Sequence, residues 1–315
     1  MEPGAQKSWV DRIWNGDRIA LAKAITLAES SLPEDRVRAL SLLAMAASRP
    51  AKSLRLAITG PPGAGKSTLI EALGMEFVNS GFRVAVLSVD PSSPRTGGSI
   101  LGDKTRMQNL SSNPNAFVRP SPSLGASGGV APRTHEAIAL SEAAGYQVIL
   151  IETVGVGQAE YAVAEISDAV LLIMIPGAGD SIQAMKRGIL DVADGIVINK
   201  CDGINQMAAE QLREELEQAL LVRQSGFTDE PVRVSCCSAL THKGIPEQAE
   251  YWMRFSESGW TSGSFSERRL DQACRRVINL ISGMPSEQRN RITHCTDAMK
   301  TGAMNEYQVL LHALA

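Results

Sequence analysis

Short apolar runs alternate with longer segments of mixed polarity through the middle of the chain. Six of these runs are rich in β-branched and aliphatic residues and end at glycine, proline or polar residues: 54–59, 84–89, 148–151, 169–175, 195–198 and 232–236. Continuous apolar runs of this length are typical of strands buried on both faces, and the segments between them are long enough for helices. The pattern therefore predicts an α/β fold with a mostly parallel central sheet and flanking helices.

Apolar residues recur at helical spacing on both sides of this region. Residues 19–47 carry two apolar stripes with a break at 30–33, which predicts two amphipathic helices. Later in the chain one stripe lies within 270–281 and another within 307–314. Two serine-rich patches, in contrast, are interpreted as loops or linkers: 121–129 and 256–266. We therefore divide the chain into an N-terminal helical extension, a central domain and a C-terminal helical arm: 1–52, 53–262 and 263–315.

The composition is that of a globular protein with ample material for a core. The 315 residues are 44% hydrophobic and 21% charged, with a formal net charge of -3. This charge gives no broad electrostatic footprint for nucleic acid or an anionic membrane, so neither is an expected partner. The first ten residues lack a signal or transit pattern, which predicts a cytoplasmic location. The five cysteines form no CxxC pair and the four histidines are scattered, so we expect reduced thiols and no transition-metal site.

A glycine-rich segment joins the first apolar run to a helix-like stretch, Lys66–Asn79. It fits the pattern GxxxxGK[ST] in full: Gly60, Pro61, Pro62, Gly63, Ala64, Gly65, Lys66, Ser67 and Thr68. Glycines let such a loop curl so that successive backbone N–H groups face phosphate oxygens, and the N-terminus of the following helix adds positive potential. Lys66 would neutralise the β- and γ-phosphates, and the Ser67 hydroxyl would bind Mg²⁺. The segment therefore predicts a nucleotide phosphate site.

A second motif follows the run at 195–198, where Asn199, Lys200 and Asp202 fit the pattern NKxD. The Asp202 carboxylate can accept hydrogen bonds from both N1–H and the 2-amino group of guanine, whereas adenine would leave that carboxylate unpaired. The Lys200 stem would lie along the ring, and Asn199 would brace the pocket. A backbone N–H from the turn after the last run would face the guanine O6: Ser238, Ala239 and Leu240. The predicted bound nucleotide is therefore GTP or GDP.

Acidic residues stand at the ends of two apolar runs, at the edge of a parallel sheet where ligands bind. Asp90 follows the second run and Glu152 follows the third, so both are placed to reach Mg²⁺ or its waters. A turn or capping role for Asp90 stays open. Asp103 lies in the charged segment 88–107, which we interpret as a switch, and its spacing alone indicates a solvated loop carboxylate.

Four sequence blocks together resemble one family of phosphate-loop proteins. They are DPSSPRTGGSILGDKTRM at 90–107, ETVGVGQAE at 152–160, PGAGDSIQAMKRGIL at 176–190 and NKCDG at 199–203. The chain is similar in these blocks to the MeaB/ArgK GTPases of the SIMIBI class, and the resemblance runs from about 16–17 to at least Pro246. The first block is long and highly specific. The resemblance implies the fold of a P-loop NTPase.

The resemblance further implies a homodimeric, Mg²⁺-dependent GTPase that serves as a chaperone for adenosylcobalamin-dependent acyl-CoA mutases, typically methylmalonyl-CoA mutase. Such a protein gates cofactor loading and protects the mutase, and it binds no cobalamin itself. The C-terminal arm would form the dimer, and the segment 177–188 would be a switch that responds to the mutase. The implied metal-binding residues are Ser67, Asp90, Asp103 and Glu152. The implied catalytic residues are Lys66, Asp103, Glu152 and Lys186.

The chain departs from the family pattern at Cys201, where alanine is usual, and the tail after about Tyr251 is less recognisable. Cys201 points away from the base in the usual geometry, so guanine selection should survive. Two other functions stay open. A nickel-insertion maturation GTPase would share the class fold but usually carries His-rich or Cys-based metal sites. A transport-associated kinase or ATPase would need an acceptor-binding site, and the sequence identifies none. The identity of the client mutase is also open.

Overall fold

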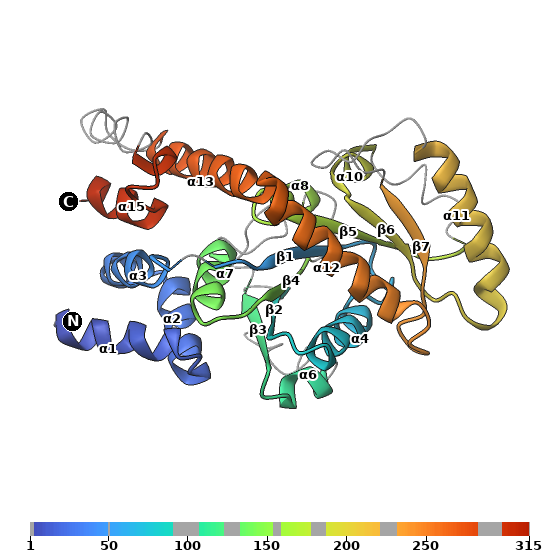
Figure 1. Cartoon of the computed structure of the whole chain (residues 1–315), viewed down its shortest axis with the longest axis horizontal. Coiled ribbons are helices and arrows are strands. Elements are labelled where there is room, and N and C mark those ends of the chain that lie inside the picture. The colour runs from blue at the N-terminus through green and yellow to red at the C-terminus, as the bar shows by residue number, and fades with distance from the viewer. Residues whose placement is uncertain are drawn as a thin grey trace. The chain divides into compact units, whose positions relative to one another are not determined.

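The computed structural model describes most of the chain: residues 3–49, 51–90, 107–122, 133–153, 159–177, 187–220, 232–282 and 298–314. The chain forms two compact units (Figure 1). One unit consists of Met1–Lys52, Arg133–Tyr146 and Phe265–Ala315, and the other consists of Ser53–Pro132 and Gln147–Ser264. Among the described helices, none combines the length and the apolar character needed to cross a membrane.

The second unit contains a seven-stranded sheet in which every described pairing is parallel. Its strands are β1 Leu54–Thr59, β2 Val84–Asp90, β3 Ala116–Pro122, β4 Val148–Glu152, β5 Ala169–Met174, β6 Gly195–Ile198 and β7 Arg233–Cys236. They lie in the order β3-β2-β4-β1-β5-β6-β7. All residues of β1, β4, β5 and β6 are buried, as expected for the central strands of a parallel sheet covered on both faces.

The six strands expected from the apolar runs are confirmed, with ends that differ by one residue at most, but β3 was not predicted. Its sequence AFVRPSP contains Pro120 and Pro122, which have no N–H to donate to a neighbouring strand. Proline is tolerated there because β3 lies at the edge of the sheet and pairs only with β2 among the described strands. Strand β3 was therefore missed because its two prolines are typical of a loop.

The helices of this unit lie between the parallel strands or, for α12, after the last one: α4 Lys66–Asn79, α6 Gln108–Ser112, α8 Ala159–Ala164, α10 Arg187–Val192, η1 Gly203–Asn205, α11 Gln206–Leu220 and α12 Ile245–Ser262. The connection from β1 to β2 moves along the sheet in one direction, and that from β4 to β5 moves in the other. Right-handed crossovers therefore place α4 and α8 on opposite faces, where α4 packs with α12 and α8 with α10 (Figure 1).

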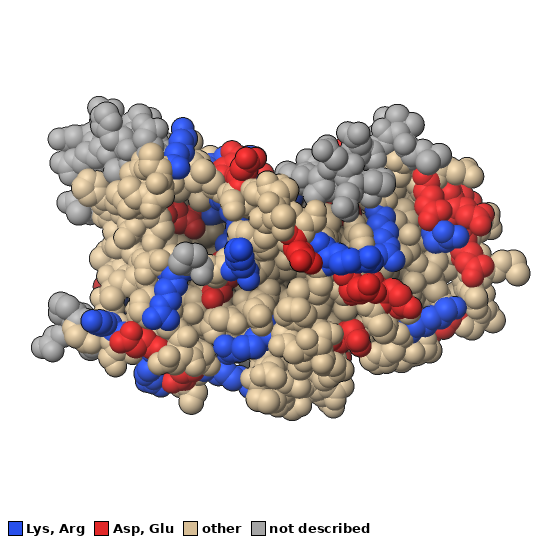
Figure 2. All heavy atoms as spheres, in the orientation of Figure 1, with Lys and Arg blue, Asp and Glu red and all other residues tan. Residues whose placement is uncertain are grey.

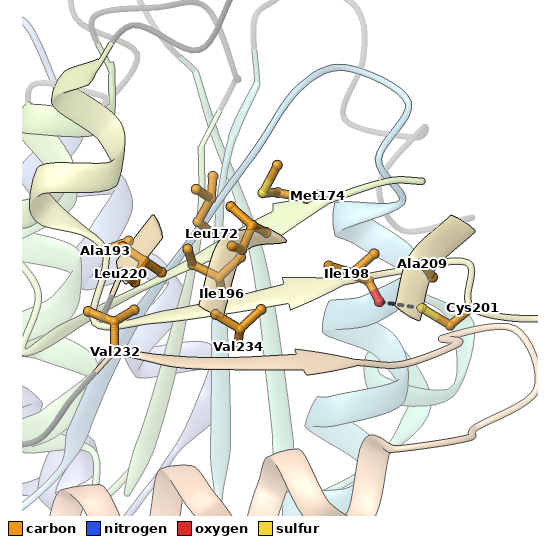
Figure 3. Close-up of a cluster of buried hydrophobic side chains, with 11 residues drawn as sticks. Leu172, Met174, Ala193, Ile196, Ile198, Cys201, Ala209, Leu220, Val232 and Val234 are labelled. Carbon is orange, nitrogen blue, oxygen red and sulfur yellow. Dashed lines mark hydrogen bonds between the residues drawn. The ribbon is translucent and has the colours of Figure 1, made fainter. Parts of the chain in front are cut away.

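A buried apolar cluster joins the last three strands to α11 (Figure 3). The strands contribute aliphatic side chains such as Ile196 and Val234, and α11 closes the cluster with Ala209, Leu216 and Leu220. The opposite side of α11 is polar, and acidic side chains gather over this helix at the surface (Figure 2). The helix is thus held by its apolar face, in line with its amphipathic sequence.

Residues 256–266 are helical, so their interpretation as a loop or linker is wrong. Helix α12 continues to Ser262, and α13 Ser264–Ser282 begins after Gly263, whose φ of +83° marks the break. The serines that suggested a linker lie in α12 and at the start of α13, and α12 also carries large apolar anchors. Trp252 is fully buried, and the Trp260 Nε1 donates to Ser53 O at 3.0 Å. The apolar positions, rather than the serine content, decide the structure here.

The first unit is helical. Its helices are α1 Pro3–Trp14, α2 Arg18–Glu29, α3 Pro33–Ala46, α7 Thr134–Ala143, most of α13, and α15 Glu306–Leu314. A polar network links α7, α13 and α15: His135 Nδ1 lies 2.9 Å from Tyr307 Oη, His135 Nε2 lies 3.3 Å from Glu306 Oε1, and Arg276 Nη2 lies 2.8 Å from Glu306 Oε2. Residues 133–146, which the sequence division assigned to the central domain, thus belong to this unit.

Candidate nucleotide-binding site

The loop 60–65 lies between the carboxyl end of β1 and the first turn of α4. Gly60 and Gly65 have φ of +150° and +89°, a range that L side chains rarely adopt. A Cβ on Gly60 would lie 2.4 Å from the carbonyl oxygen of Ile173, and one on Gly65 would lie 2.7 Å from the Asn199 Nδ2. Glycine is therefore required at both positions by conformation and by space, and the loop leads directly into a helix N-terminus suited to bind phosphate.

Replacing Gly65 with alanine tests this dual requirement, and Gly81→Ala is its matched control. Gly81 has the same φ of +89°, but nothing lies within 4 Å of its added Cβ. We expect both variants to lose about 1–2 kcal/mol of unfolding free energy in urea, because both force a side chain into the left-handed region. Only Gly65→Ala should also weaken GDP binding, by about tenfold or more, because it displaces Asn199. Equal GDP affinity in the two variants would contradict the assigned role of Gly65.

Lys66 is the cation of the phosphate loop. Its Nζ donates to the carbonyl oxygens of Gly60 and Pro61 at 2.8 and 3.2 Å, so the side chain folds back over the loop. Burial lowers the pKa of the Lys66 ammonium from its ordinary value, while the nearby Glu152 carboxylate acts to raise it. The loop thus holds a partly desolvated positive charge, for which phosphate oxygens are suitable partners.

Ser67 and Glu152, predicted from separate motifs, lie in direct contact. The Ser67 hydroxyl donates to Glu152 Oε1 at 2.7 Å, and Glu152 is 8% exposed. Hydroxyl and carboxylate oxygens are ligands of the kind that Mg²⁺ prefers, so this pair fits the predicted metal site. Asp90 ends β2, but its side chain lies outside the described atoms, as do all of Asp103 and Lys186. The predictions for those three residues therefore stay predictions.

Asn199 links the phosphate loop to the predicted base site. Its Nδ2 donates to Ala64 O at 2.9 Å, and its Oδ1 accepts from the Ala239 N–H at 3.0 Å. The residue is 3% exposed and follows β6, so a single buried amide joins the loops after β1, β6 and β7. This side chain brings together two motifs that are 135 residues apart in the sequence.

The other predicted base-contacting residues lie at the same edge of the sheet. Asp202 Oδ2 accepts from the Ser238 hydroxyl at 2.8 Å, which orients the carboxylate. Lys200 is exposed with a φ of +63°, and Leu240 is 79% exposed. These positions leave both side chains available to contact a base.

The prediction that a backbone N–H of the turn Ser238, Ala239 and Leu240 faces the guanine O6 stays a prediction. The Ser238 N–H donates to Lys243 O at 2.9 Å, and the Ala239 N–H donates to Asn199. Both groups are thus used within the protein to shape the turn and to hold Asn199. The signal that sequence reasoning missed is the need of a buried asparagine amide for partners of its own.

Cys201 faces the core, as expected. It is 3% exposed, and its thiol donates to Ile198 O at 3.0 Å (Figure 3). Hydrogen bonding with the neighbouring Cys236 thiol, together with burial, raises the pKa of Cys201, whereas the same hydrogen bond lowers the pKa of Cys236. Burial raises the pKa of Cys237 to about 12. The cysteine in the third position of the NKxD motif is therefore part of the buried apolar cluster.

The chain is similar to a family of GTPases over most of its length. A family model described as "Methylmalonyl Co-A mutase-associated GTPase MeaB" matches residues 21–291. A putative GTPase of Caulobacter vibrioides is 48% identical over 84% of this chain and 81% of that protein. The mitochondrial methylmalonic aciduria type A homolog of Mus musculus is 42% identical over 88% of this chain and 70% of that protein. A solved structure described as a LAO/AO transport system kinase is 32% identical, covers 100% of this chain and 98% of that chain, and has a TM-score of 0.73.

Proposed function

The chain belongs to the MeaB family of GTPases, and on that premise we propose that it uses GTP hydrolysis to serve as a chaperone of an adenosylcobalamin-dependent acyl-CoA mutase. It would assist assembly and cofactor loading of the mutase and protect the loaded enzyme. The description of the family and the name of the mouse relative support methylmalonyl-CoA mutase or a close relative as the client. The observation that carries the nucleotide part is the Asn199 side chain, which joins the phosphate loop to the base site.

Each part of the bound GTP has a candidate partner. The backbone N–H groups of 60–68 and the Lys66 ammonium would hold the phosphates, and Asp202 would accept from the guanine N1–H and 2-amino group. Ser67 and Glu152 would hold Mg²⁺, with Asp90 and Asp103 as further candidates. Bound there, Mg²⁺ would neutralise charge on the β- and γ-phosphates.

Hydrolysis at this site would rest on positioning and charge neutralisation. Water attacks the γ-phosphate in line with the leaving oxygen, and Lys66 and the loop N–H groups stabilise the charge that develops. Asp103 and the segment around Lys186 would respond to the mutase and complete the site, by analogy with the switches of other GTPases. The isolated protein is accordingly expected to be a slow GTPase.

Helix α13 supports the proposed dimerisation of the C-terminal arm. Ile278 is 55% exposed and Leu280 is 46% exposed, although both are large apolar residues on one long helix. Exposed apolar side chains of this kind are candidate contacts for a partner. A second copy of the chain is the proposed partner for this part of α13.

Phosphate release tests the proposed function. GTP is supplied to the purified chain alone and with each candidate cobalamin-dependent mutase, and ATP serves as the control nucleotide. We expect slow release with GTP, several-fold faster release with one mutase, and no comparable release with ATP. If the chain hydrolyses GTP at a rate that no mutase changes, the GTPase activity is supported and the chaperone role is overturned.

Phosphotransfer to a transport protein is a second candidate, favoured by the description of the similar solved structure as a transport system kinase. The same assay separates the two when the GTP is radiolabelled at its γ-phosphate, because a kinase transfers that phosphoryl group to a protein acceptor. Label that appears only as free phosphate supports hydrolysis. Label retained on an added transport protein would support the kinase.

A further inference from the structure

Ser88 is a buried hydroxyl in a strand that is otherwise apolar up to its last residue. It is 1% exposed on β2, and its Cα is in register with that of Glu152 on the neighbouring β4. Residues in register on adjacent parallel strands project to the same face of the sheet. The Ser88 hydroxyl accordingly reaches the carboxylate and donates to Glu152 Oε2 at 2.9 Å.

The two oxygens of Glu152 accept from two different serines. Oε2 accepts from Ser88 on β2, and Oε1 accepts from Ser67 in the first turn of α4. An ionised carboxylate only accepts, so each hydroxyl must point its proton at Glu152. The lone pairs of Ser67 then point away from the carboxylate, which is the orientation that a hydroxyl needs in order to bind a cation.

We propose that Ser88 is a positioning residue for magnesium-assisted nucleotide binding. The terminal torsion of a glutamate side chain is broad, so a carboxylate held at one oxygen can rotate. The hydrogen bond from Ser88 fixes the second oxygen and thereby holds Oε1 against Ser67. This inference rests on the magnesium site of the proposed function, and it adds a residue that contacts neither the nucleotide nor the metal-binding oxygen of Ser67.

Two other buried serines of the chain satisfy their hydroxyls within their own backbone segments. Ser141 and Ser167 are both fully buried, and each donates to a backbone carbonyl four residues earlier, at 2.8 Å. Ser88 instead donates to an ionisable side chain of the site. Partners that orient a metal ligand from outside the coordination shell typically change metal affinity by about 10–100-fold when they are removed.

The experiment measures binding of fluorescent mant-GDP to the full chain while Mg²⁺ is titrated, and repeats the binding in EDTA. We expect Ser88→Ala to raise the Mg²⁺ concentration at half-effect about tenfold and to leave binding in EDTA unchanged. Ser88→Thr keeps the hydroxyl, so it should return the midpoint to within about threefold of the parent. Ser167→Ala is the matched control, because it removes a buried hydroxyl of the same unit that lies elsewhere, and its midpoint should equal that of the parent.

Three results would overturn the proposal, two of them at the level of Ser88 and one at the level of the magnesium site. If the parent chain responds to Mg²⁺ and Ser88→Ala shares the midpoint of Ser167→Ala, Ser88 does not position Glu152. The same conclusion follows if Ser88→Thr melts at the parental temperature but keeps the raised midpoint of Ser88→Ala. If Mg²⁺ changes mant-GDP binding in none of the proteins, including the parent, the magnesium site itself is overturned. Phosphate release from GTP still tests the GTPase in that case.

Discussion

Lys66→Ala is expected to lower the rate of GTP hydrolysis by about 10³-fold, which corresponds to about 4 kcal/mol of transition-state stabilisation. In the proposed site, the ammonium is the charged side chain with which the phosphate loop would contact the phosphates directly. Its two hydrogen bonds are to the carbonyl oxygens of Gly60 and Pro61 within that loop. Alanine removes the charge but leaves the glycine conformations of the loop, so the effect should fall on chemistry far more than on folding.

The surroundings of Lys66 explain why one charge should matter so much. Burial of the side chain lowers its pKa, and the same partial desolvation strengthens its attraction for a phosphate oxygen. The Glu152 carboxylate acts in the opposite direction and favours the protonated form. Lys66 therefore faces a less polar environment than a surface lysine, and the interaction lost with its ammonium is larger than a surface ion pair would supply.

The measurement is the steady-state rate of phosphate release at saturating GTP, with the melting temperature of each variant as a folding check. Lys23→Ala removes an exposed lysine on α2 and should hydrolyse GTP at the parental rate. Lys66→Arg keeps a positive charge but replaces a compact ammonium with a planar fork, so it should also be strongly impaired. A folded Lys66→Ala variant with more than about a tenth of the parental rate would contradict the electrostatic role assigned to Lys66.

Local patterns predicted the sheet well because a buried parallel strand requires a continuous apolar run. Strand β4, for example, has the sequence VILIE and is buried throughout, so its apolar run is enough to predict the strand. Strand β3 was not predicted because it contains two prolines, which a strand tolerates only at the edge of a sheet. Which strand lies at the edge depends on the whole sheet and cannot be read from a local pattern. The helical structure of 256–266 was not predicted either, because the serine content of this segment is typical of a linker although the apolar residues of α12 hold it as a helix.

The site was predictable wherever its chemistry is written in adjacent residues. The phosphate loop needs glycines at fixed offsets from Lys66, so the motif itself carries the geometry. Contacts between motifs were not predictable in the same way. The hydrogen bond from Ser88 to Glu152 spans 64 residues and depends on the register of β2 against β4. The Asn199 contact with Ala64 likewise exists only because β1 and β6 end at the same edge of the sheet.

Asp202→Asn is expected to lower the affinity for GTP by about 10²- to 10³-fold, because guanine loses one of two charge-assisted hydrogen bonds and meets a donor at its 2-amino group. The same change should favour xanthosine triphosphate, whose base keeps N1–H but carries an oxygen at position 2. An asparagine amide offers one acceptor and one donor in the matching arrangement. The expected result is therefore a reversal of base preference as well as a loss of affinity.

Competition binding of GTP against xanthosine triphosphate measures this reversal, and the structure shows why the amide should take one orientation. The Ser238 hydroxyl donates to Asp202 Oδ2 at 2.8 Å, so the equivalent oxygen of asparagine can keep that bond. Asp191→Asn, at an exposed position of α10, makes the same chemical change away from the base and should leave the preference for GTP intact. If Asp202→Asn instead bound GTP as tightly as Asp191→Asn does, the carboxylate would not contact guanine, and selection would have to arise from the ring faces through Lys200 and Leu240.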